Sequence, residues 1–294
     1  MLHLEAINRS FGDRQVLRDV TFDVTAGRMT GFVGANGAGK TTSMRIILGV
    51  LAPDSGQVSW QGSPLTREDR RRFGYMPEER GLYPKMTVRD QLVYLGRLHG
   101  MTLDGVRRKV DELLEWLSLG ERGNDPVENL SLGNQQRAQI AAALVHDPDV
   151  LVLDEPFSGL DPMAVDTVVS VLREHTHRGV PVLFSSHQLD VVERLCDDLV
   201  IIADGQIRAA GSRDSLREAY AQRRFSLIVA GDAGWVRDLP GVALVDLDGP
   251  RAVFDLADDA DDQVVLRAAL ERGPVRSFGP VTPSLAEIFR EVAR

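Results

Sequence analysis

Residues 34–41 have the types and the spacing needed to bind phosphate groups. They read Gly-Ala-Asn-Gly-Ala-Gly-Lys-Thr, which fits the pattern G-x-x-x-x-G-K-[ST] in full. Glycines let such a loop curl until successive backbone N–H groups point at one anion. Lys40 adds a positive charge near the β- and γ-phosphates, and Thr41 adds a hydroxyl ligand for Mg²⁺.

This loop predicts a nucleoside triphosphate site. The alternative, a glycine-rich turn with an incidental lysine, is disfavoured because a strand-like segment precedes the loop and a helix-like segment follows it. The start of that helix would add its partial positive charge at the same place. The residues predicted to contact the nucleotide are Gly34, Asn36, Gly37, Ala38, Gly39, Lys40, Thr41 and Thr42.

Asp154 and Glu155 form a second group of residues whose side chains could take part in catalysis. They follow the apolar run 150–153, and ligands of parallel α/β sheets collect at the carboxyl ends of the strands. We expect Asp154 to hold Mg²⁺, directly or through water, and Glu155 to orient and polarise the attacking water. A helix cap beside a surface charge is the alternative, which the phosphate loop upstream disfavours.

The elements that must position these residues indicate an α/β fold. The apolar, β-branched runs 150–153, 180–184 and 199–202 alternate with helix-like segments at 162–178 and 188–196, as in a parallel sheet covered on both faces. Residues 29–33 read as a further strand, and the helix after the phosphate loop should end near Gly49.

Two other regions flank this core. Residues 2–24 alternate apolar and polar types around a Gly12–Asp13 turn, which predicts an antiparallel β-region joined by a strand at 57–60. Residues from about 86 to 145 have helical periodicity and predict an α-helical subdomain.

The composition changes after residue 221, so we expect one domain at 1–221 and a small α+β domain at 222–294. A short helix near 214–221 should precede the second domain, which should contain strands at 225–230, 242–247 and 251–256 and a helix at 262–271. Ser284 and Glu287 have the spacing of a capping box for a last helix. The acidic residues of 258–262 lack the glycine and terminal glutamate of a calcium loop, so a solvated turn at a helix start is expected.

The bulk properties exclude several classes of protein. The chain has 294 residues and a formal net charge of −9, which argues against general nucleic-acid binding. The arginines 67 and 70–72 are interleaved with acidic residues and predict a solvated helix face. Cys196 is the single cysteine and predicts a buried thiol in a reducing compartment. A signal peptide and an apolar run of about 18 residues are both lacking, so a cytoplasmic location is expected.

Further segments, in order along residues 2–215, resemble the ATP-binding cassette of ABC transporters. Residues 130–137, Leu-Ser-Leu-Gly-Asn-Gln-Gln-Arg, are similar to the signature motif LSGGQ, and residues 158–161 are similar to the D-loop. Phe11 stands where the family has the aromatic that stacks on adenine, and His187 where it has the switch histidine. The resemblance implies a P-loop NTPase fold with a parallel-sheet core, an antiparallel β-subdomain and an α-helical subdomain, and it implies ATP and Mg²⁺ as cofactors.

The signature segment is a second anion site, because Ser131 and Gly133 precede a helix expected to run from Asn134 to about Val145. In the family, the signature of one subunit covers the ATP on the phosphate loop of the other. The resemblance therefore implies a homodimer closed by ATP, in which Ser131, Gly133 and Asn134 bind the partner's nucleotide, Glu155 and His187 act in catalysis with Lys40, and hydrolysis releases the dimer.

Two positions depart from the common family pattern. Glu78 stands where most relatives have the glutamine of the Q-loop, and a carboxylate there can still coordinate Mg²⁺. Leu132 and Asn134 replace a glycine and a glutamine of the signature. These departures and the extra C-terminal domain resemble the ATPases that pair with separate ABC-2-type membrane proteins, including sodium and drug exporters.

The leading hypothesis is an ATPase subunit of a membrane exporter, peripheral on the inner face of the cell membrane and bound to a multi-spanning permease. A soluble ABC ATPase acting on nucleic acid or ribosomes is a second class. It is disfavoured because there is one cassette and only 91 positions (131 − 40) separate Lys40 from Ser131, too few for a long coiled-coil insert. A regulatory or resistance ATPase without a transport partner is the third class.

Overall fold

The fold was analysed in a computed structural model, which describes residues 1–294 except 80, 221–222, 258, 282 and 293–294. The chain divides into two compact units, Met1–Arg213 with the chain end from Val292, and Asp214–Glu291. The boundary expected between residues 221 and 222 falls on residues outside this description.

A mainly parallel sheet forms the centre of the first unit. Among the described residues it has six strands in the order β10-β9-β3-β8-β7-β6, and all neighbours are parallel except β10 and β9. The strands are β3 (Met29–Val33), β6 (Phe73–Met76), β7 (Val150–Leu153), β8 (Val182–Ser186), β9 (Asp198–Ala203) and β10 (Gln206–Ser212). The parallel sheet predicted from the apolar runs is therefore confirmed. Every residue of β3, β7 and β8 is buried, as expected for strands covered on both faces.

Strand β8 begins two residues later than the sequence predicted, at Val182 instead of Val180. Pro181 stands immediately before it and has no backbone N–H to donate to a ladder. The strand also ends two residues later than predicted, at Ser186. The hydroxyls of Ser185 and Ser186 therefore lie at the carboxyl end of the sheet, where Asp154 follows β7.

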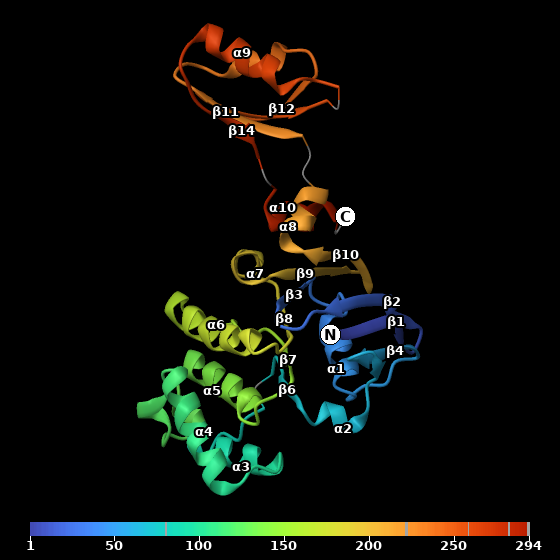
Figure 1. Cartoon of the computed structure of the whole chain (residues 1–294), viewed down its shortest axis with the longest axis vertical. Coiled ribbons are helices and arrows are strands. Elements are labelled where there is room, and N and C mark those ends of the chain that lie inside the picture. The colour runs from blue at the N-terminus through green and yellow to red at the C-terminus, as the bar shows by residue number, and fades with distance from the viewer. Residues whose placement is uncertain (80, 221–222, 258, 282, 293–294) are drawn as a thin grey trace. The chain divides into compact units, whose positions relative to one another are not determined.

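An antiparallel sheet lies on one side of this core, and helices α3–α6 lie on the other (Figure 1). In the described part of the chain its order is β2-β1-β4-β5, with bounds β1 (Leu2–Phe11), β2 (Arg14–Val24), β4 (Ser55–Trp60) and β5 (Ser63–Pro64). Gly12 has φ +57° in the β1–β2 turn, which confirms the expected hairpin. Buried apolar residues of both sheets and of α1 form one core.

The helices of the first unit follow the predicted periodicity. Their bounds are α1 (Lys40–Ile47), α2 (Arg67–Arg70), α3 (Val88–Leu98), α4 (Leu103–Trp116), α5 (Leu132–Leu144), α6 (Pro162–His177) and α7 (Leu189–Leu195). Thr87 and Thr102 cap α3 and α4 with their hydroxyls. The helical subdomain expected at 86–145 corresponds to α3, α4 and α5.

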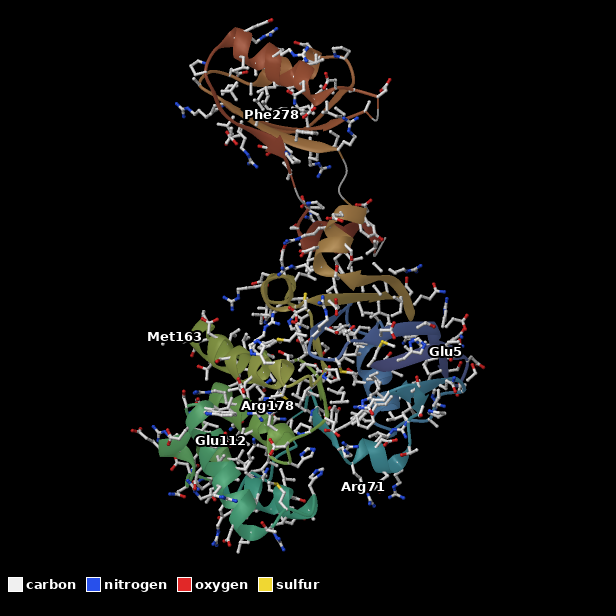
Figure 2. All side chains as sticks on the ribbon, viewed as in Figure 1. Glu5, Arg71, Glu112, Met163, Arg178 and Phe278 are labelled. Carbon is white, nitrogen blue, oxygen red and sulfur yellow. The ribbon has the colours of Figure 1, made fainter. Side chains whose placement is uncertain are left out.

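The arginines around α2 were expected to form a solvated face, and Arg70 departs from that expectation. Its guanidinium turns inward and donates hydrogen bonds to the carbonyls of Ile47 (2.9 Å) and Leu65 (3.1 Å), where it ties the end of α1 to the loop before α2. Arg71 and Arg72 are exposed, and Figure 2 shows Arg71 at the surface beyond α2.

The second unit packs a four-stranded antiparallel sheet, counted over its described residues, against the helix α9 (Asp262–Arg272). The strand order is β12-β13-β11-β14, with bounds β11 (Arg224–Val229), β12 (Val242–Asp248), β13 (Arg251–Leu256) and β14 (Val275–Pro280). This is a split β-α-β arrangement in which the 3₁₀ helix Gly234–Asp238 replaces the first helix. Phe254 lies in the core of this unit, and Phe278, labelled in Figure 2, packs against it.

The ends of the second unit carry the helices α8 (Arg213–Ala219) and α10 (Leu285–Val292). The predicted capping box of α10 is confirmed: Ser284 N donates to the Glu287 carboxylate (2.9 Å), and Glu287 N donates to Ser284 Oγ (3.3 Å). The acidic turn before α9 is also as predicted, because Asp261 caps that helix. Asp258 lies outside the described residues.

Candidate functional site

The phosphate loop connects β3 to α1, and two of its glycines are required by close contacts. A Cβ on Gly34 would lie 2.4 Å from the carbonyl oxygen of Ile202. Gly39, at φ +113°, is the residue before α1, and a Cβ there would lie 2.5 Å from a methyl group of Leu17. Only glycine fits both positions, so the loop can press against β9 and β2 and leave the start of α1 open to an anion.

Lys40 is buried in this loop, with 7% of its surface exposed. Its ammonium donates hydrogen bonds to the carbonyls of Gly34 (2.6 Å) and Ala35 (3.3 Å). Burial lowers the pKa of Lys40, and the negative charges of Glu155, Asp154 and Glu78 oppose that shift. The ammonium therefore bonds to the loop carbonyls and is also attracted by the three carboxylates.

Asp154 and Glu155 follow β7 and share one partner on the neighbouring strand. The hydroxyl of Ser185 donates to Asp154 Oδ1 (2.5 Å) and accepts from the backbone N–H of Glu155 (2.9 Å). Among the described residues, the other carboxylate oxygen of Asp154 is buried and has no hydrogen-bond partner. An unpartnered buried carboxylate oxygen suits a hard cation.

Glu155 is directed toward His187. Its backbone adopts φ +52°, in the left-handed region, and its carboxylate lies 3.0 Å from His187 Nδ1. The two side chains come from the ends of β7 and β8, which are neighbours in the sheet. Sequence reasoning placed both residues in one site, and the structure brings them into contact.

Lys40, Asp154 and Glu155 line one open cleft of ≈ 460 Å³, and His187 is not among its lining residues. Its walls come from the β1–β2 hairpin, the phosphate loop with α1, the segment after β6 and the end of β7. The lining residues are Phe11, Arg14, Val16, Asn36, Gly37, Gly39, Lys40, Thr41, Thr42, Glu78, Asp154 and Glu155. Gly34 and Ala38 belong to the same loop but are buried and do not line the cleft.

Phe11 stands at the mouth of the cleft with 50% of its surface exposed. The guanidinium of Arg9 lies 4.9 Å from the centre of its ring. Sequence reasoning missed Arg14 and Val16, which also line the cleft. The predicted hairpin could have indicated both residues. Arg14 pairs with Phe11 across the turn, and Val16 follows two residues later on the same face.

The signature residues are arranged around the start of α5. The helix begins at Leu132 and not at Asn134 as expected, because the hydroxyl of Ser131 caps it by accepting from Asn134 N (3.4 Å). Gly133 therefore lies in the first turn. Of Ser131, Gly133 and Asn134, all described, none lines the cleft that holds Lys40.

Cys196 follows α7 and is buried, as predicted. Burial raises the pKa of its thiol to about 12, so it is unreactive at neutral pH. A search of the described helices finds none that is long and apolar enough to cross a membrane.

Comparisons with known proteins agree with this geometry. The family "ABC transporter" matches residues 17–158, and the family "ATP-binding protein DrrA1-3-like, C-terminal domain" matches residues 211–293. The ABC transporter ATP-binding protein YhaQ of Bacillus subtilis is 36% identical over 99% of this chain and 98% of its own. The Nod factor export ATP-binding protein I of Burkholderia lata is 40% identical over 79% of this chain and 77% of its own.

A solved "Structure of ATP binding subunit of ABC transporter" superposes with a TM-score of 0.69 at 32% identity, over 75% of this chain and 93% of that one. The full-length relative, the family match over the nucleotide cleft and this superposition all point the same way. The chain belongs to the family of ATP-binding subunits of ABC transporters.

Proposed function

We propose that the chain binds and hydrolyses ATP to power an ABC-2-type membrane exporter. The observation that carries the proposal is that Lys40, Asp154 and Glu155 line one cleft. His187 lies 3.0 Å from the Glu155 carboxylate. The DrrA1-3-like second unit and the likeness to an export ATP-binding protein support export as the direction of transport.

Catalysis in this cleft would rest on positioning and electrostatics. The N–H groups of the phosphate loop and the ammonium of Lys40 bind the phosphates, and Lys40 exchanges the carbonyls of Gly34 and Ala35 for phosphate oxygens. Glu155 orients the attacking water and takes its proton. His187, 3.0 Å from the Glu155 carboxylate, would fix the direction of that carboxylate and act on the γ-phosphate side. Phe11 stacks on the base.

The oxygen donors in the cleft fit a magnesium ion. The unpartnered oxygen of Asp154, the hydroxyl of Thr41 and the carboxylate of Glu78 are the hard ligands that Mg²⁺ prefers. Once bound, the ion would neutralise charge on the β- and γ-phosphates. Glu78 replaces the neutral amide of most relatives, so this site carries one more negative charge to balance the ion.

A second copy of the chain completes the site in this proposal. Ser131 and Gly133 present a capped helix start, which is an anion site, yet they do not line the cleft around Lys40. In a two-fold dimer each signature segment covers the nucleotide of the other subunit. ATP then stabilises the dimer, and hydrolysis removes that stabilisation.

The permease would be a separate multi-spanning protein, which places the chain on the inner face of the cell membrane. The test uses inside-out vesicles that contain the chain and the membrane protein with which it co-purifies. ATP-dependent transport that is lost with Lys40→Ala supports the proposal. A chain that hydrolyses ATP as a dimer, but binds no membrane protein and moves no solute, would favour the regulatory or resistance alternative.

A further inference from the structure

The backbone of Glu155 accepts a hydrogen bond from α5, the helix that carries the signature segment. Gln136 of α5 directs its side chain at this residue, and its Nε2 donates to the carbonyl oxygen of Glu155 (2.9 Å). The same oxygen accepts from the N–H of Ser158 (3.2 Å). Gln136 is buried, with 7% of its surface exposed, so this hydrogen bond is shielded from water.

A second contact joins the same helix to the same loop. Residues 155–160, here called the post-β7 loop, pass over the first turns of α5. A Cβ on Gly159 would lie 3.0 Å from a methyl carbon of Leu132, and a Cβ on Gly133 would lie 3.6 Å from the carbonyl oxygen of Gly159. Leu132, which replaces a glycine of the common signature, therefore packs on the post-β7 loop.

Different elements of the fold therefore hold different groups of Glu155. Its N–H bonds to Ser185 of β8, its carboxylate pairs with His187, and its carbonyl is held by Gln136. The Gln136 and Ser185 hydrogen bonds hold the two peptide groups on either side of the Glu155 Cα, the atom from which the side chain branches. Loss of the Gln136 hydrogen bond therefore loosens the backbone that carries the carboxylate.

We propose that Gln136 is a positioning residue through which the signature helix controls the orientation of Glu155 within one chain. Gln136 lies five residues after Ser131, about 7.5 Å along the helix axis at 1.5 Å per residue. When the signature of α5 engages a nucleotide, the helix is fixed, and Gln136 then holds Glu155 in its working orientation. The inference rests on the proposed role of Glu155 in hydrolysis, and it does not depend on the permease.

The test compares three variants of the full-length chain by steady-state ATP hydrolysis. Gln136→Ala removes the donor. Gln136→Glu keeps the size and donates only while its carboxyl is protonated. Gln91→Ala is the matched control, because Gln91 is a buried glutamine of α3 whose Oε1 accepts from the backbone N–H of Tyr83 (2.8 Å), outside the signature segment and the post-β7 loop. Thermal unfolding checks that each variant is folded.

We expect Gln136→Ala to lower kcat by about tenfold or more, with KM for ATP within about twofold of the wild-type value. The Gln136→Glu variant should lose kcat as well, because its ionised carboxylate keeps the size of the side chain but cannot donate to the Glu155 carbonyl. Gln91→Ala should keep kcat within about twofold.

Wild-type kcat in folded Gln136→Ala or Gln136→Glu, or an equal loss in Gln91→Ala, would each overturn the inference. These readouts are made on the purified chain, so they are independent of transport. If the wild-type chain hydrolyses ATP but vesicles move no solute, the exporter proposal fails and the role of Gln136 is still decided by its own kcat.

Discussion

The stability of the first unit should depend on pH through a half-buried histidine, His146. His146 follows α5, and its ring stacks on that of His99 at the end of α3, with 3.7 Å between ring centres and 11° between planes. Its Nε2 lies 3.2 Å from the carbonyl oxygen of Phe73, and its Nδ1 is buried without a partner among the described residues. Burial, reinforced by the charge that His99 gains on protonation, lowers the pKa of His146 to about 4.

The sign of the effect follows from proton binding in the two states. The unfolded chain takes up a proton on His146 near pH 6.5, whereas the folded chain does so near pH 4. Above pH 6.5 both states are neutral and the residue contributes nothing to the pH dependence. As the pH falls from 6.5 to 4, the free energy of unfolding decreases, by about 3 kcal/mol in full (2.5 pH units at 1.36 kcal/mol each) and by about 2 kcal/mol at pH 5.

The measurement is equilibrium unfolding in urea at pH 7.5 and pH 5.0. His146→Gln removes the titrating ring and keeps an amide that can donate to Phe73. Its free energy of unfolding should fall by about 2 kcal/mol less than that of the wild type between the two pH values. His177→Gln, which alters an exposed histidine of α6, is the control and should follow the wild type. Parallel pH dependence of wild type and His146→Gln would refute the reasoning.

Three further outcomes are expected at the nucleotide cleft. Lys40→Ala should abolish phosphate release and weaken ATP binding by about 10- to 100-fold, because a charged hydrogen bond is lost, and wild-type turnover in this variant would disprove the phosphate-loop assignment. Glu155→Gln should lower kcat by about 10²- to 10⁴-fold while ATP binding persists, and full activity would show that the base lies elsewhere. Ser185→Ala should lower the free energy of unfolding by about 2–4 kcal/mol in a denaturant titration, since it leaves the Glu155 N–H and an oxygen of Asp154 unpaired; an unchanged midpoint would contradict this.

Much of the first unit could be predicted from the sequence, because its central strands are buried on both faces and appear as unbroken apolar runs. Residues 150–153 and 199–202 are examples. The edge strands were harder. Strand β10 (Gln206–Ser212) and strand β14 (Val275–Pro280) were not predicted, since an edge strand needs no apolar run and tolerates glycine and proline.

The phosphate-binding part of the site could be predicted because its residues are contiguous in sequence. Contacts that depend on side-chain direction could not. The inward turn of Arg70, the hydroxyl of Ser185 between Asp154 and Glu155, and the amide of Gln136 on Glu155 all join segments that are far apart in sequence. Periodicity gives the face on which a residue lies, but not which distant carbonyl its polar atom will meet.

The left-handed backbone of Glu155 has a consequence for how the protein can evolve. A non-glycine residue at φ +52° costs the folded state about 1–2 kcal/mol relative to glycine, which adopts this conformation freely. Replacement by glycine would relieve that cost and, at the same time, remove the carboxylate. Selection for stability alone would therefore drift toward an inactive protein at this position, so the glutamate persists only while turnover is under selection.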